Sequence, residues 1–142
     1  MLKAAKISEY QSKYSIDWKI EMPSGCPPED IEIPIEHKLY RLTLDKKGSL
    51  TERDLITYSE LEPNKDWGDH YFQSFGLSLI TKISEAKKKL LLPNIRKQNL
   101  NGVAEVTLNP TDGVVKQTGR KDHYTWWQTK SFDISNHKPI EI

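Results

Sequence analysis

The stretch His123-Tyr124-Thr125-Trp126-Trp127 holds three large aromatic side chains and a histidine within five residues. This composition favours a β-strand, in which neighbouring side chains point to opposite faces of the sheet. Tyr124 and Trp126 then share one face, and the other three residues share the opposite face. Either both faces are buried, or one of them carries a binding surface. If only one face is buried, the face of Tyr124 and Trp126 is the better core, because it carries two aromatic rings.

Five further segments predict strands around this one. Each is rich in apolar or β-branched residues, and turn-forming residues separate it from its neighbours. The five segments cover residues 37–44, 72–81, 102–108, 114–118 and 131–134. The turn signal Asn109-Pro110-Thr111-Asp112-Gly113 lies between the third and the fourth. It predicts that residues 102–118 form a hairpin.

Helices are predicted mainly in the first two-thirds of the chain. Residues 2–14 repeat apolar side chains at helical spacing, and residues 52–60 follow Thr51, which has capping-box spacing to Asp54. A third helix starts after Ser84 and ends at Pro93. Early helices and late strands predict an α+β fold with a mainly antiparallel sheet of four to six strands and two or three helices.

The length of 142 residues predicts one globular domain, residues 1–142. Within it, residues 1–22 are expected to be a helical N-terminal segment. Residues 23–36 hold four prolines and are expected to be a stiff connector, and residues 37–142 form the body that contains the sheet.

The formal net charge is only +1, but the two halves of the chain differ in sign. Residues 1–75 carry ten Lys/Arg and fourteen Asp/Glu, which gives −4. Residues 76–142 carry eleven and six, which gives +5. Either the acidic half packs against the basic half, or the basic half faces an anionic partner such as nucleic acid or a nucleotide.

Several classes of protein are disfavoured by what the sequence lacks. Four scattered histidines and the single Cys26 have no ligand spacing, so we expect no metal. The glycines form no phosphate-binding loop, and we expect no cofactor. One cysteine, no signal-like segment and no long apolar window predict a cytoplasmic protein without a membrane partner.

Binding residues are expected where aromatic and basic side chains come together. Cations beside exposed aromatic rings suit a nucleobase and its phosphate. Tryptophan is also frequent at the centre of protein interfaces. The candidates for binding are Trp67, Lys116, Arg120, Lys121, His123 and Trp127.

Four polar residues in the predicted strands are the candidates for catalysis: Arg41, Ser78, Glu105 and His123. Tyr40-Arg41 on an early strand, Gly76-Leu77-Ser78-Leu79 on a strand before a helix, and Glu105 on a later strand form a layout that resembles ADP-ribosyltransferase-like folds. The resemblance covers residues 38–108 and implies a cleft for NAD. The chain lacks the Ser-Thr-Ser signature of several such groups, and Glu105 is not part of a Glu-x-Glu signature.

Three classes of function therefore stay open. The first is a non-catalytic accessory domain that works with a larger protein partner. The second is a nucleic-acid- or nucleotide-binding module that uses the basic C-terminal half. The third is a small ADP-ribosyltransferase-like enzyme that acts on NAD or nucleic acid.

Overall fold

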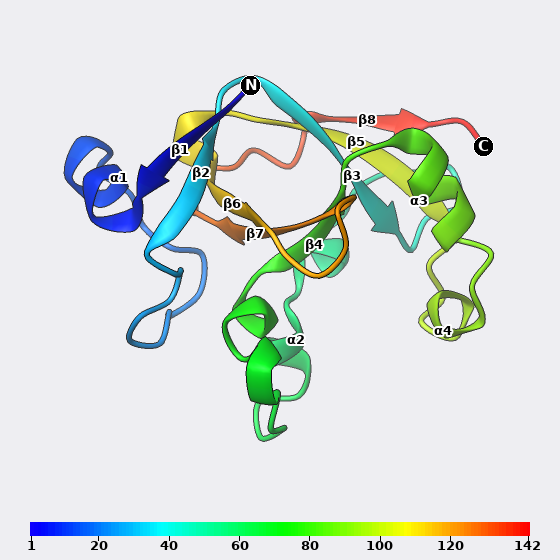
Figure 1. Ribbon diagram of the computed structural model, residues 1–142. Helices are drawn as coiled ribbons and strands as arrows, with labels where there is room; N and C mark the ends of the chain where they lie inside the picture. Colours follow the sequence, from blue (N-terminus) through cyan, green and yellow to red (C-terminus); the bar gives the residue numbers. More distant parts are fainter.

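The computed structural model describes residues 1–142, which form one α+β domain around a single eight-stranded antiparallel sheet (Figure 1). The strand order is β1-β2-β6-β7-β4-β3-β5-β8. The strands are β1 (Leu2–Lys6), β2 (Asp30–Pro34), β3 (His37–Thr43), β4 (Leu77–Ile80), β5 (Gly102–Leu108), β6 (Gly113–Gln117), β7 (His123–Gln128) and β8 (His137–Ile140).

Short helices lie between the strands, and none is longer than seven residues. The α-helices are α1 (Ile7–Lys13), α2 (Tyr58–Leu61), α3 (Ile83–Lys89) and α4 (Pro93–Arg96). The 3-10 helices are η1 (Glu52–Leu55), η2 (Gly68–His70), η3 (Phe72–Phe75) and η4 (Pro110–Asp112). The α+β class and the antiparallel sheet are confirmed, but the sheet has more than the four to six strands that the sequence predicted.

The additional strands lie in segments where the sequence predicted other structure. Residues 2–6 form β1 and are not helical, because all five pair with β2 in antiparallel register. That pairing outweighs the helix propensity of Ala4 and Ala5. The helix predicted for residues 2–14 is confined to α1. The connector of residues 23–36 contains β2, in which Ile31 and Ile33 are buried.

The hairpin predicted for residues 102–118 is wrong. β5 pairs with β3 and β8, whereas β6 pairs with β2 and β7. Between them, η4 is closed by a capping box in which Asp112 accepts from the backbone N–H of Asn109. Gly113 then leaves η4 at φ 128°, where a Cβ would lie 2.1 Å from the backbone oxygen of Trp127. The chain therefore continues into β6, which pairs with β7, and does not fold back onto β5.

The strand at residues 123–129 is confirmed as β7, and both of its faces are buried. Trp126 belongs to the largest core cluster, with Leu39, Val106 and Val115. Trp127 lies on the other face, where it packs with Tyr10 of α1. Both tryptophan side chains are 0% exposed.

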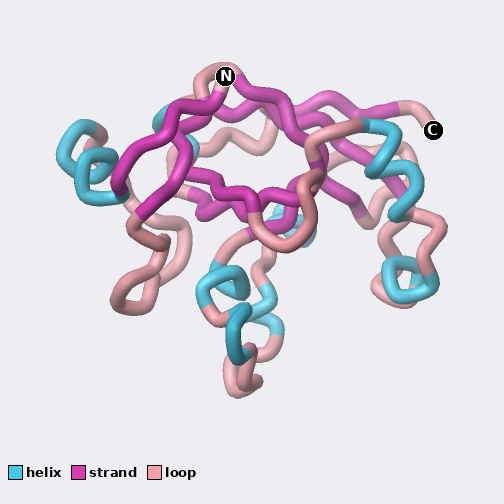
Figure 2. Tube along the Cα trace, in the orientation of Figure 1, coloured by secondary structure: helices cyan, strands magenta, loops and turns pink.

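Two arms extend from the sheet next to β4 (Figures 1 and 2). We call residues 52–76 the α2 arm and residues 82–101 the α3–α4 arm. The α2 arm connects β3 to β4, and the α3–α4 arm connects β4 to β5. β3 and β4 are joined by one residue pair, Tyr40 and Ile80, and beyond this pair the two strands part.

Candidate functional site

A cleft of about 700 Å³ opens between the two arms. Its floor is formed by β3, β4 and the first residue of β7, and its walls are the α2 arm and the α3–α4 arm. This volume lies in the range that small-molecule sites occupy in proteins. Three of the four residues predicted for catalysis line this arm cleft: Arg41, Ser78 and His123. Two of the six residues predicted for binding also line it: Trp67 and His123.

Arg41 lies at the floor of the arm cleft, in the gap where β3 and β4 part. Its Nε and Nη2 donate to the backbone oxygen of Asp54 over 3.0 and 2.7 Å, and its Nη1 donates to the backbone oxygen of Ser78 over 2.9 Å. A guanidinium has five N–H groups, so one remains on Nη1 and one on Nη2. Burial lowers the pKa of Arg41, but a guanidinium stays protonated at neutral pH.

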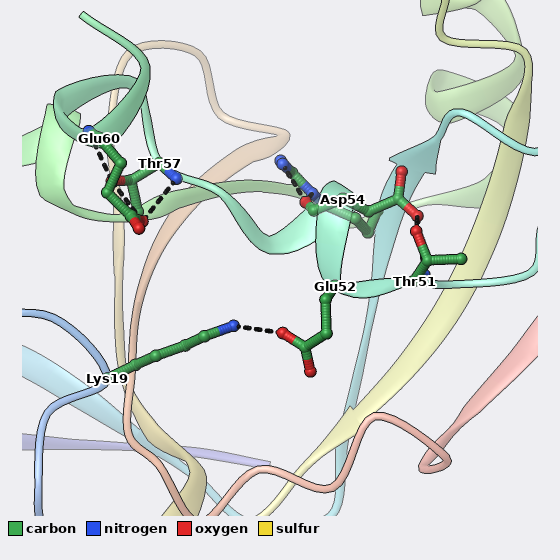
Figure 3. Close-up of polar contacts among 7 residues, drawn as sticks. Lys19, Thr51, Glu52, Asp54, Thr57 and Glu60 are labelled. Carbon is green, nitrogen blue, oxygen red and sulfur yellow. Dashed lines mark hydrogen bonds and ion pairs between the residues drawn. The ribbon is translucent and has the colours of Figure 1, made fainter.

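No carboxylate is paired with Arg41. None of the ion pairs of the structure includes it. The carboxylate whose charge acts on Arg41 is that of Asp54, which is 3% exposed. Its carboxylate accepts from the backbone N–H groups of Leu44 and Thr51, each over 2.8 Å, and so closes the capping box of η1 (Figure 3). Arg41 therefore donates only to neutral carbonyl groups, and the negative charge of Asp54 acts on it without an ion pair or a hydrogen bond between the two side chains.

The α2 arm gives the arm cleft an aromatic wall. Tyr58 and Trp67 have ring centroids 5.5 Å apart, and Lys65 Nζ lies 4.3 Å from the centroid of the Trp67 ring. A second capping box starts α2: Thr57 donates from its backbone N–H to Glu60 Oε1 over 3.0 Å (Figure 3). This cap fixes where α2 begins and hence where Tyr58 stands.

His123 closes the floor at the β7 end. Its Nδ1 lies 2.9 Å from the backbone oxygen of Thr118, and a carbonyl oxygen only accepts, so Nδ1 carries the proton. Burial, assisted by the nearby charge of Lys89, lowers the pKa of His123, while the bond to Thr118 opposes this. The imidazole is therefore neutral at pH 7, and its Nε2 is an acceptor.

Glu105 does not reach Arg41. In the register of β3 and β5, Tyr40 is opposite Glu105 and Arg41 is opposite Ala104, so the two charged side chains point to opposite faces of the sheet. Glu105 instead accepts from Tyr40 Oη over 3.4 Å and lies 3.7 Å from Lys38 Nζ. The structure thus separates the glutamate from the cleft that the ADP-ribosyltransferase-like layout requires.

The remaining predicted binding residues lie outside the arm cleft. Trp127 is in the core, because its Nε1 donates to the backbone oxygen of Phe72 over 3.0 Å and no part of its side chain is exposed. Lys116 is on β6, opposite Thr125. Arg120 and Lys121 are exposed in the turn between β6 and β7. Both tryptophans of β7 are buried, and the aromatic side chain of this strand that is partly exposed is Tyr124.

Other residues of the arm cleft were missed by the sequence analysis. Among them are cationic and apolar residues of the arms: Arg53, Ile56, Tyr58, Leu61, Lys65, Lys89, Ile95 and Leu100. One signal was present in the sequence, because Thr57-Tyr58-Ser59-Glu60 is a capping box that places an aromatic residue at the first position of a helix.

The chain has no match among protein-family models, curated proteins or solved structures. The structure contains no group of three or more His, Cys, Asp or Glu side chains that could hold a metal ion. None of its helices has the length and apolar character that crossing a bilayer requires.

Proposed function

We propose that the protein binds a nucleotide or a short single-stranded nucleic acid in the arm cleft. The observation that carries this proposal is Arg41, a guanidinium at the cleft floor with two unused N–H groups and no carboxylate partner. Arg41 is half-buried, and a charge withdrawn from water is normally paired. A guanidinium fork matches the oxygens of a phosphate. A phosphate at Arg41 would supply the missing negative charge.

The other charges of the arm cleft favour the same ligand. Arg53, Lys65 and Lys89 line it together with Arg41. The two acidic residues in the lining are Asp54 and Glu62. The carboxylate of Asp54 is used in its cap, and Glu62 lies 3.5 Å from Lys65. An excess of cations therefore faces the cleft.

The aromatic wall suits a planar base. Tyr58 is 44% exposed, so its ring offers a face to a ligand. Trp67 carries Lys65 over its ring, and its Nε1–H has no acceptor in the protein. A base that displaces the Lys65 side chain would gain a stacking surface without breaking an internal hydrogen bond of Trp67. Stacking of a base on an aromatic side chain contributes about 1–3 kcal/mol.

The test is to titrate the protein at low salt with AMP, with ATP and with a short oligodeoxynucleotide. Binding is measured by tryptophan fluorescence and by calorimetry. Trp67→Leu is expected to weaken binding about tenfold, because it removes the stacking ring. Arg41→Lys is expected to weaken it to a similar extent, because a lysine keeps the charge but loses the fork. Binding should fall steeply as salt is raised.

Arg120→Lys is the matched control for Arg41→Lys, since Arg120 is exposed in the β6–β7 turn. It should bind as the wild type does. If charge reversal at Lys116, Arg120 and Lys121 abolishes binding while Arg41→Lys has no effect, the ligand site is the turn. If the folded protein binds none of the three ligands, the proposal is rejected.

A second function, a domain that works with a protein partner, is favoured by a different observation. The α2 arm exposes several large apolar side chains outside the sheet core, among them Leu61 at 60% and Tyr71 at 46%. Exposed apolar surface of this kind is found at protein interfaces. A partner that copurifies with the wild type and is lost from Leu61→Ser/Tyr71→Ser would support this function. Equal retention by both would contradict it.

A further inference from the structure

The α3–α4 arm is the most basic segment of the chain. Residues 82–101 carry six Lys/Arg and one acidic residue, Glu85, which gives a net charge of +5. The cations are Lys82, Lys87, Lys88, Lys89, Arg96 and Lys97. Lys88 is paired with Glu85, and Lys89 lies 3.9 Å from Asp122. The remaining four form no ion pair.

Two exposed leucines lie in the link between α3 and α4. Leu91 is 67% exposed and Leu92 is 44% exposed. Their neighbours Leu90 and Ile95 pack against the core cluster that contains Ala86 of α3. The arm is thereby held to the sheet by one apolar side, and Leu91 and Leu92 remain on the outside.

We propose that Leu91 and Leu92, in the link between α3 and α4, form with the unpaired cations of the arm a peripheral contact site for an anionic lipid bilayer. The leucines would enter the boundary between headgroups and acyl chains, and the unpaired cations on both sides of them would contact the headgroups. Apolar side chains flanked by Lys and Arg are what such a surface binds.

The observations favour a bilayer over a nucleic acid or a protein. A phosphate backbone would pair with the cations but offers no apolar medium to two exposed leucines. A protein partner would need a groove that matches the two leucines, whereas the acyl region accepts apolar side chains of any shape. The expectation of no membrane partner rested on the lack of a long apolar window, and a surface contact does not require one.

The test is cosedimentation of the full chain with vesicles of phosphatidylcholine alone and of phosphatidylcholine with about one-third phosphatidylserine. We expect binding only to the second. Leu91→Ser/Leu92→Ser should weaken it at least tenfold. The matched control is Ile142→Ser, an apolar residue of similar exposure (56%) that lies outside the α3–α4 arm, and it should bind as the wild type does.

The role of charge is tested with the double variant Lys87→Glu/Lys97→Glu. Its control is Lys46→Glu/Lys47→Glu, because all four lysines are exposed. Each lost cation should lower the binding constant about fivefold. No binding of the folded protein to the anionic vesicles at low salt would overturn the proposal. So would vesicle binding that an oligonucleotide displaces and that the double leucine variant leaves unchanged, which would assign the arm to nucleic acid.

Discussion

Arg41 donates from Nη1 to the backbone oxygen of Ser78, 2.9 Å away, at the point where β3 and β4 part. In a continued ladder Ser78 would face Leu42 of β3, two residues from the single pair of Tyr40 and Ile80. The guanidinium thus replaces a strand partner and keeps the gap open. The gap is the floor of the arm cleft. The Arg41 side chain therefore both spans the gap between the two strands and places a positive charge in the cleft.

The first prediction concerns the stability of this gap. Arg41→Met removes the donors for the backbone oxygens of Asp54 and Ser78, and we expect the free energy of unfolding to fall by about 1–3 kcal/mol. Arg41→Lys, which keeps one cationic donor group, should lose less. Urea unfolding followed by circular dichroism measures both. A methionine variant as stable as the wild type would show that water solvates the two oxygens equally well.

Much of the sheet was predicted because its central strands have strong local signals. β5 matches its predicted range of 102–108, and β3 and β7 match theirs within one residue at the C-terminal end. The signals failed where pairing partners decide the structure. Residues 2–6 become a strand only because β2 lies beside them. The strand at Asp30–Pro34 was not predicted, because the prolines around it indicated a connector. The last strand, β8, lies at residues 137–140 and not at the predicted 131–134.

The candidate site was predicted only in part, for a geometric reason. Arg41, Ser78 and His123 come from β3, β4 and β7, which are neighbours in the sheet. The pairing of these strands brings the three residues together. Glu105 is on the strand next to β3, but a shift of one residue in register decides which face it takes. The walls come from arms whose positions depend on long-range packing, which local patterns do not reveal.

The second prediction tests the two buried faces of β7. Trp126 and Trp127 are both fully buried, and each Nε1 donates to a backbone oxygen over 3.0 Å. Trp126→Ala and Trp127→Ala should each lower the free energy of unfolding by about 3–5 kcal/mol. Thermal and urea unfolding of the two variants provide the measurement. A small effect at Trp127 alone would mean that the face packed on α1 contributes little.

The third prediction uses a double-mutant cycle on Glu105→Gln and Arg41→Gln. The register of β3 and β5 places the two side chains on opposite faces, so their effects on stability should add within about 0.5 kcal/mol. A coupling energy above about 1 kcal/mol would mean that the charges meet in one cleft. That result would revive the enzyme interpretation, because the ADP-ribosyltransferase-like layout needs both groups together.

The fourth prediction concerns the single thiol. Cys26 is buried, and burial raises its pKa to about 12. The thiolate is the reactive form, so the native protein should react with Ellman's reagent far more slowly than the protein in urea. Rapid labelling of the folded protein at pH 8 would show that the loop of residues 23–29 opens, and that Cys26 is accessible as a nucleophile.

The last prediction is a dependence of stability on pH. Burial lowers the pKa of His123 and of His37, and the terminal amino group adds to the effect at His37. In the unfolded chain a histidine takes up its proton near its ordinary pKa of about 6.5. As the pH falls below that value, the unfolded state binds protons that the folded state does not, so the free energy of unfolding decreases. Above that value both states are neutral at these residues, and their contribution to stability is complete.

His123→Gln should therefore reduce the loss of stability between pH 7 and the acid range, because glutamine does not titrate. His70→Gln is the control, since His70 is exposed on η2 and makes no side-chain hydrogen bond, and it should follow the wild-type curve. Urea unfolding at a series of pH values measures the slope for all three proteins. If His123→Gln keeps the full wild-type slope, His123 is protonated as readily in the folded protein as in the unfolded chain. The imidazole at the cleft floor would then be a cation near pH 6, and it would join Arg41 in holding an anion.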